Sequence, residues 1–206
     1  MVVGRSGVGP KQEGDGRSPE GLFGLGPVFG YSTDPPPGLG SRRDSISDGD
    51  SRAGLSSGVD PGAGQSRNPG PRLPYEPTAP LAVCVDDVGS AFYNLVFDAD
   101  TLSSPKDWTS AEAMRRDLAH GDDLYKWGIQ VRYSDPPQPG AGSCIFLHIW
   151  RGPGSPTAGC TAMAENDLLS LFGWLTEGAV LVQGTRAYLE GLREEGLLPY
   201  RIPPTP

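Results

Sequence analysis

The stretch Cys144-Ile-Phe-Leu-His-Ile-Trp150 decides the fold and points to the chemistry. It is a short apolar run, which predicts a buried strand, and it carries His148, one of only two histidines in the chain. The sequence Thr157-Ala-Gly-Cys160 then places a cysteine twelve positions after that histidine. The glycine before it can turn sharply without a Cβ penalty. Because a thiol becomes a nucleophile when a neighbouring base takes its proton, the pair predicts Cys160 as nucleophile and His148 as base.

Strands are predicted on either side of this run. Tyr125–Tyr133 alternates apolar and polar residues, which is typical of a strand with one covered face. The turn-rich segment 135–142 joins it to 144–150, so the two strands are expected to pair antiparallel. Strands are also predicted at 22–29, 81–85 and 179–183. The segment 91–97 is predicted to be a strand or a mixed turn.

Helices are predicted at three places. Leu168, Leu171, Phe172 and Leu175 recur at helical spacing after the cysteine. If that helix begins close behind Cys160, its dipole would favour the thiolate. A short helix is expected at 110–118 and an amphipathic helix at 186–198. Several short strands with one main helix predict a mostly-β domain.

Composition divides the chain of 206 residues into four parts. Glycine (30) and proline (22) make up a quarter of it, and much of the excess falls between Thr33 and Arg72, where Leu39 is an isolated large hydrophobic residue. Such a segment buries too little apolar area to offset its ordering entropy. We therefore predict a domain in two parts, 1–32 and 73–184, around a disordered insertion at 33–72, with a helix and Pro-rich tail at 185–206.

Charge and hydropathy limit the partners. The net charge of −8 comes without a basic stripe, so nucleic acid is not an expected partner. No apolar run approaches the roughly 20 residues that span a bilayer, and the first residues lack the pattern of a signal peptide.

The segment Phe146-Leu-His148 with Thr157-Ala-Gly-Cys160 resembles the catalytic signature of the L,D-transpeptidases (YkuD-type domain), in which a strand-borne histidine is followed by Ser/Thr-x-Gly-Cys. A second patch, Lys11-Gln-Glu-Gly-Asp-Gly-Arg-Ser-Pro-Glu-Gly-Leu-Phe23, is similar to the family's Lys-x-x-Gly-Asp-x-x-Thr-Pro-x-Gly-x-Phe. The two patches stand in the family's order, and the resemblance covers about residues 1–184.

The resemblance implies a β-rich, sandwich- or barrel-like fold with one main helix after the cysteine. It implies an acyl transferase that acts on peptidoglycan stem peptides in the bacterial cell envelope, as a monomer and without a cofactor or metal. Cys160 would form a thioester and His148 would be the general base and acid. The amides of Gly159 and Cys160 would stabilise the oxyanion, and the Thr157 hydroxyl would brace the turn.

Three features depart from the family pattern. Ile149 follows the histidine where the family usually has glycine, and Ala162 stands where it usually has a basic residue that could contact a substrate carboxylate. The chain also opens at Met1–Arg5 on what reads as the middle of a strand. We therefore expect N-terminal strands to be missing, and an export signal with them.

Several interpretations stay open. Trp127, Trp150 and Tyr93 could line a substrate cleft or belong to the core. Cys84 and Cys144 could form a disulfide. The preferred interpretation is that they are two small, unpaired residues buried on strands. His120, beside two aspartates, has no standard zinc spacing and is read as a solvated loop residue. The rival functions are a non-catalytic envelope-binding module and a cysteine peptidase or carboxypeptidase.

Overall fold

The computed structural model describes residues 1–39 and 72–198. Most of the segment interpreted as an insertion therefore lies outside the described residues, as does the Pro-rich tail from residue 199.

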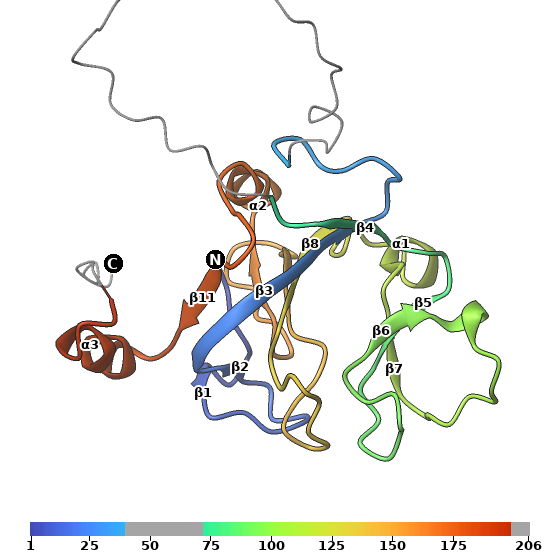
Figure 1. Cartoon of the computed structure of the whole chain (residues 1–206), viewed down its shortest axis with the longest axis horizontal. Coiled ribbons are helices and arrows are strands. Elements are labelled where there is room, and N and C mark those ends of the chain that lie inside the picture. The colour runs from blue at the N-terminus through green and yellow to red at the C-terminus, as the bar shows by residue number, and fades with distance from the viewer. Residues whose placement is uncertain (40–71, 199–206) are drawn as a thin grey trace, which may run out of the picture.

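The main sheet is built around the long strand β3 (Gly21–Gly30), which crosses the centre of Figure 1. On one side β3 pairs antiparallel with β8 (Trp127–Val131), and β8 pairs antiparallel with β9 (Phe146–Ile149). This confirms the predicted antiparallel pair. The sheet is extended by β10 (Thr161–Met163), parallel to β9, by β11 (Val180–Gln183), antiparallel to β3, and by β4 (Tyr75–Pro77), parallel to β3.

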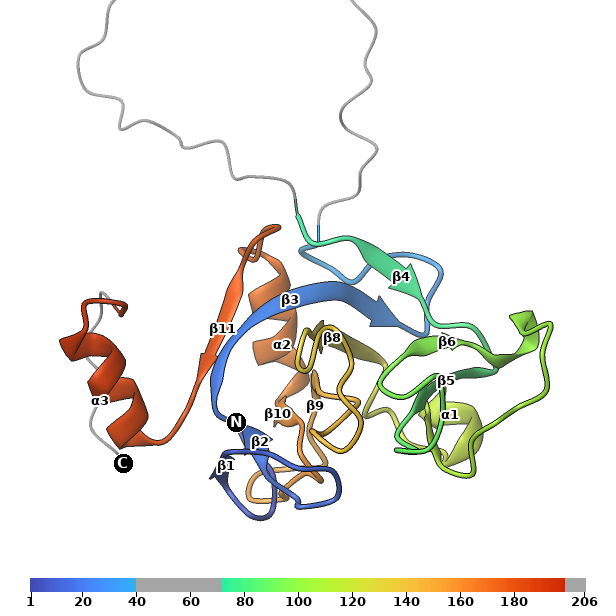
Figure 2. The same ribbon diagram turned by 60° about the horizontal axis from the view of Figure 1, so that its bottom comes forward.

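Two smaller sheets flank the main one. In the first, β5 (Ala82–Val85) lies between β6 (Val96–Asp98) and β7 (Ala111–Ala113), all antiparallel. Figure 2 shows this sheet beyond β4 and the end of β3, on the side away from β11. The second pairs β1 (Val8–Gly9) with β2 (Ser18–Pro19).

The described residues contain three α-helices: α1 (Arg116–Ala119), α2 (Glu165–Phe172) and α3 (Arg186–Glu194). Helix α2 packs on the main sheet with Leu168 and Phe172 fully buried. Figure 1 shows α3 at the opposite end of the molecule from the β5–β7 sheet. A 3₁₀ turn, η2 (Ala99–Thr101), follows β6. The mostly-β architecture with one main helix behind the cysteine is as predicted.

Side chains alternate along β9 and the two residues before it, and this alternation separates two hydrophobic clusters. Ile145 and Leu147 belong to the cluster that includes α2, whereas Cys144 and Phe146 belong to the cluster that contains Cys160. Successive side chains of a strand point to opposite faces of a sheet. The cysteine therefore lies on the face of the sheet opposite α2.

Three sequence predictions are wrong. Residues 110–118 form β7 and the start of α1 instead of one helix, because β7 pairs with β5, a non-local contact that overrides local propensity. Helix α2 begins at Glu165, and β10 separates it from Cys160, so its dipole does not act at the thiol. Leu39 is 3% exposed and joins the α2 cluster, so the first residues of the interpreted insertion contribute to the core.

Candidate active site

Cys160 sits at the end of a braced turn, immediately before β10. Its carbonyl oxygen accepts hydrogen bonds from Thr157 Oγ1 (2.5 Å) and from the fully buried Ser18 Oγ (2.9 Å). Ser18 Oγ in turn accepts from the Gly4 N–H at 2.9 Å. Thr157 Oγ1 also accepts from the Gly159 N–H (3.2 Å), which leaves the Cys160 N–H as the candidate oxyanion donor of the two amides.

The N-terminal segment forms part of this support. Val2 bridges to Ala162 of β10, and Gly4 bridges to Thr157. A Cβ at Gly4 would lie 2.3 Å from the Gly16 carbonyl oxygen, so only glycine fits at this close approach. The first residues of the chain therefore hold the cysteine turn in place.

The thiol of Cys160 is buried against the start of β9. Sγ accepts a hydrogen bond from the Phe146 N–H and donates to the Cys144 carbonyl, both at 3.3 Å. Burial is the main cause that raises the pKa of this thiol to about 12, with the negative charge of Glu112 second. The Phe146 N–H, the Tyr125 hydroxyl and the Lys11 charge act in the opposite direction. The resting group is therefore a neutral thiol.

His148 lies on the strand that neighbours the cysteine, opposite Ala162 in the β9–β10 register. Its Nδ1 lies 2.7 Å from the Ile149 carbonyl oxygen. Because a carbonyl only accepts, Nδ1 carries the proton in this contact and Nε2 is the basic nitrogen. Burial lowers the pKa of His148 to about 4, so the imidazole is neutral at physiological pH. A neutral imidazole is the form that a general base requires.

Both groups line a cavity of about 510 Å³. Its walls come from the N-terminal segment, the β5–β7 sheet with α1, the strand β9 and the cysteine turn. The charged and aromatic side chains on these walls, besides His148, are Arg5, Lys11, Glu13, Asp86, Glu112, Arg116, Tyr125, Trp150 and Arg151.

Tyr125 connects the two candidate catalytic groups to the β5–β7 sheet. Its ring meets the His148 ring edge-on, with centroids 5.1 Å apart, and its hydroxyl donates to Glu112 Oε1 at 2.6 Å. Burial raises the pKa of Glu112, and the Tyr125 hydrogen bond and the Arg116 charge oppose that shift. Arg116 lies over the Tyr125 ring, 5.5 Å from its centroid.

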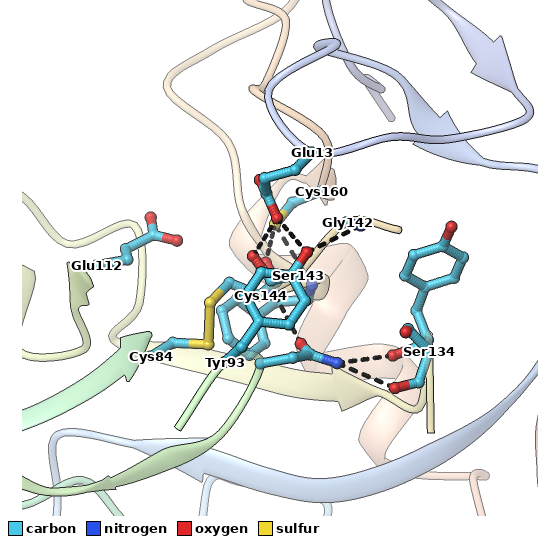
Figure 3. Close-up of a disulfide and its surroundings, with 12 residues drawn as sticks. Glu13, Cys84, Tyr93, Glu112, Ser134, Gly142, Ser143, Cys144 and Cys160 are labelled. Carbon is cyan, nitrogen blue, oxygen red and sulfur yellow. Dashed lines mark hydrogen bonds between the residues drawn. A yellow bond between two sulfur atoms is a disulfide. The ribbon is translucent and has the colours of Figure 1, made fainter. Parts of the chain in front are cut away.

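Cys84 and Cys144 form a disulfide, which corrects the preferred sequence interpretation of two free buried residues. The bond joins β5 to Cys144, whose carbonyl accepts a hydrogen bond from the Cys160 thiol, across a sequence separation of 60. Cys144 has a positive φ of 55°, and its N–H donates a hydrogen bond to Asn94 Oδ1 at 2.9 Å. The disulfide thus fixes the β5–β7 sheet beside the cavity (Figure 3).

The three aromatic residues considered for substrate binding lie in different places. Trp150 lines the cavity. Trp127 belongs to the core cluster on the α2 face, where its ring packs with Tyr75. Tyr93 is 2% exposed, donates to Glu13 Oε2 (2.6 Å) and accepts from the Gly142 N–H (3.0 Å), so it supports a cavity wall from behind. Figure 3 shows this support beside the disulfide.

The second sequence patch also reaches the site. The Lys11 side chain, 4% exposed, pairs with Asp15 at 3.2 Å and brings its ammonium to the cysteine turn. A Cβ on Gly159 would lie 2.9 Å from Lys11 Nζ, and one on Gly142 would lie 2.8 Å from Lys11 Cε. Absence of side chains at these two glycines makes room for the lysine.

Among the described residues, no group of three or more His, Cys, Asp and Glu side chains could hold a metal ion. His120, whose metal role was rejected on spacing, is exposed at the end of α1. No helix among the described residues has the length and apolar character of a membrane span.

Sequence reasoning gave no role to Glu112, Tyr125 and Lys11, and it named Asp86 only as one of three aspartates, with Asp87 and Asp135, that could orient His148. Glu112 lay on the polar face of a helix that does not form, and Tyr125 was read only as a strand residue. The signal that could have found Lys11 was its place in the N-terminal patch, which the resemblance marked without giving the residue a role.

Comparison with known proteins supplies the family. No curated protein and no solved structure matches the chain. The model of the L,D-transpeptidase catalytic domain, YkuD, matches residues 1–183, which include the cavity and both sequence patches. The chain therefore belongs to the YkuD family of L,D-transpeptidase catalytic domains.

Proposed function

We propose that the protein is an acyl transferase that acts on peptidoglycan stem peptides through a thioester on Cys160. The family acts on peptidoglycan peptides, which supplies the substrate class. The observation that carries the mechanism is the contact between His148 Nδ1 and the Ile149 carbonyl, because it leaves Nε2 as the nitrogen that can take a proton.

In the first half-reaction the S–H of Cys160 turns from the Cys144 carbonyl to His148 Nε2, which accepts the proton as sulfur attacks the donor carbonyl. The Cys160 N–H stabilises the tetrahedral oxyanion. His148 then protonates the leaving amine, the C–N bond breaks, and a thioester remains. The expected donor is a tetrapeptide cleaved after its diaminopimelate, with D-alanine as the leaving group.

The neutral thiol of Cys160 and the neutral imidazole of His148 suit a mechanism in which the proton moves only as sulfur attacks the carbonyl. A thiol with a raised pKa and an imidazole with a lowered one do not exchange a proton at rest. Proton transfer accompanies attack on the carbonyl, when charge moves from sulfur to the stabilised oxyanion. The Cys84–Cys144 disulfide supports the proposed location in the cell envelope, since disulfides persist in oxidising compartments.

The proposal is tested with the full chain, a tetrapeptide donor and an amine acceptor. We expect release of D-alanine together with a new amide, and loss of both in Cys160→Ala and His148→Gln. D-alanine release without amide formation would identify a carboxypeptidase with water as acceptor. Release by Cys160→Ala, or none by folded wild-type protein, would contradict the proposal.

A further inference from the structure

Lys11 places a buried ammonium against the turn that carries Cys160. Its side chain is 4% exposed, and both Lys11 and Cys160 line the cavity. Because a Cβ at Gly159 would come within 2.9 Å of Lys11 Nζ, the ammonium lies against the backbone immediately before the cysteine. Glycine permits this approach, since any side chain at position 159 would occupy the place of the ammonium.

The ammonium of Lys11 has unused donors. A lysine ammonium carries three N–H donors and accepts no hydrogen bond. Among the described residues, Lys11 Nζ donates one hydrogen bond, to Asp15 Oδ1 at 3.2 Å. Water has little access to a side chain this buried, and an unmet donor on a buried charge costs free energy. The ammonium is therefore suited to donate to an oxygen that gains negative charge in the cavity.

Asp15 holds the ammonium in place. Its Oδ1 also accepts from the Arg17 N–H, and its Oδ2 accepts from the Gln12 N–H, both at 2.8 Å. Burial acts to raise the pKa of Asp15, but the hydrogen bonds from these two amides and from Lys11 outweigh it, so the pKa is lowered and the group is ionised. The Asp15 side chain is 22% exposed against 4% for Lys11, so water screens the carboxylate more than the ammonium. A positive field therefore remains at the turn, and it acts on the Cys160 thiol.

The cysteine turn has one free amide donor for an oxyanion. Of the two amides expected to serve, the Gly159 N–H is committed to Thr157 Oγ1, which leaves the Cys160 N–H. Oxyanions of acyl transfer are stabilised by several donors placed in advance where the charge develops. Lys11 Nζ lies beside Gly159, and the peptide unit that begins at Gly159 ends in the Cys160 N–H. The ammonium is thus next to the amide that it would assist.

We propose that Lys11 is a catalytic residue whose ammonium, together with the Cys160 N–H, donates to the oxyanion of the tetrahedral intermediates in acyl transfer. The proposal rests on the acyl-transfer function above and adds a charged donor to its mechanism. Asp15 is a positioning residue, because it acts only through Lys11.

The ammonium keeps its three protons throughout, so the bonds and protons of each step stay as described above. As Cys160 sulfur attacks, the electron pair of the C=O bond moves to oxygen, and this oxygen accepts from Lys11 Nζ. When the C–N bond breaks, the pair returns to re-form the carbonyl and the contact weakens. The charge on oxygen is largest near the transition state, so the ammonium stabilises that state more than the bound substrate.

The test compares two reactions of the Cys160 thiol in the full chain, each followed by intact mass. Acylation by a saturating carbapenem passes through a tetrahedral oxyanion, whereas alkylation by iodoacetamide displaces iodide without forming one. Cys160 is the free cysteine, since the other two cysteines of the chain form the disulfide.

Three variants are compared with wild type. Lys11→Met removes the charge and the donors but keeps an unbranched side chain, and Lys11→Gln keeps a neutral donor. Lys126→Met is the matched control, because Lys126 also pairs with a carboxylate, Glu165 at 2.8 Å, and is not among the described residues that line the cavity. Circular dichroism checks that each variant is folded.

We expect Lys11→Met to lower the acylation rate by about 10²-fold or more, as for removal of one oxyanion donor, and to change the alkylation rate much less. Lys11→Gln should give a smaller loss of the same kind and carries the test if Lys11→Met does not fold. Lys126→Met should keep both wild-type rates. Unchanged acylation in the Lys11 variants, or equal slowing of both reactions, would overturn the proposal, since equal slowing would mean that Lys11 acts on the thiol.

Release of D-alanine from a tetrapeptide donor provides the second readout. We expect Lys11→Met to lower kcat and to leave KM near the wild-type value, because the contact forms as the oxyanion does. A rise in KM with unchanged kcat would overturn the proposal and identify a lysine that binds a carboxylate of the donor. Failure of folded wild-type protein to react with the carbapenem or the donor would instead refute the proposed function.

Discussion

The thiol of Cys160 donates a hydrogen bond to the carbonyl oxygen of Cys144, which is itself bonded through sulfur to Cys84. One backbone group thus joins the candidate nucleophile to the disulfide that anchors the β5–β7 sheet. The sheet that carries Glu112 and the strand that carries His148 are held around the same cavity by this connection.

Removal of the disulfide should therefore affect both stability and the site. In Cys84→Ser/Cys144→Ser the unfolded chain gains freedom over the 60-residue separation, so we expect a loss of about 2–4 kcal/mol in the free energy of unfolding. Urea denaturation measures the loss, and carbapenem acylation should also slow. Equal unfolding midpoints for the wild type and the variant would show that the disulfide does not constrain the fold.

The pH dependence of acylation should reflect the burial of His148. Because burial lowers its pKa to about 4, the imidazole stays neutral on acidification until that range, and activity is lost as pH falls through about 4. The acylation rate is measured against pH in wild type and in His148→Gln, where a loss of about 10²-fold or more is expected. An acidic limb near pH 6.5, the ordinary value for histidine, would contradict the burial account.

Thr157 should act by bracing the turn. Thr157→Val keeps the shape but removes the hydroxyl that donates to the Cys160 carbonyl and accepts from the Gly159 N–H. We expect slower acylation with a loss of about 1–3 kcal/mol in stability, because a buried carbonyl and an amide lose a partner. Thr157→Ser retains the hydroxyl and is the matched control. If valine and serine behave alike, the hydroxyl has no role in the turn.

Leu39 should behave as a core residue. It is 3% exposed and packs in the cluster with Leu168 and Phe172, so Leu39→Ala is expected to cost about 2–5 kcal/mol. Leu81, 54% exposed, provides the control: Leu81→Ala should change stability by less than about 0.5 kcal/mol. Thermal or urea unfolding of the two variants separates these cases. Similar losses for both would place Leu39 outside the core.

Local pattern was sufficient for the strands β3, β5, β8, β9 and β11 and for α2, since each has a clear apolar run or period. It failed at residues 110–118, where pairing of β7 with β5 overrides a plausible helical pattern. The Cys160–His148 pair came from a motif, so it could be proposed from sequence. The Glu112–Tyr125 contact could not, because it depends on a sheet register and on a disulfide whose pairing sequence does not determine.

The most direct test of the central claim is the intact mass of the protein after incubation with a carbapenem, measured for wild type and for Cys160→Ala. A carbapenem is an acylating β-lactam, so a nucleophile that attacks carbonyl groups opens its ring and keeps the acyl group as a covalent adduct. We expect a single adduct on the wild type and none on the variant, which would identify Cys160 as the nucleophile of a formed acyl-transfer site. No adduct on wild-type protein shown to be folded by circular dichroism, or an adduct that persists in Cys160→Ala, would contradict the account.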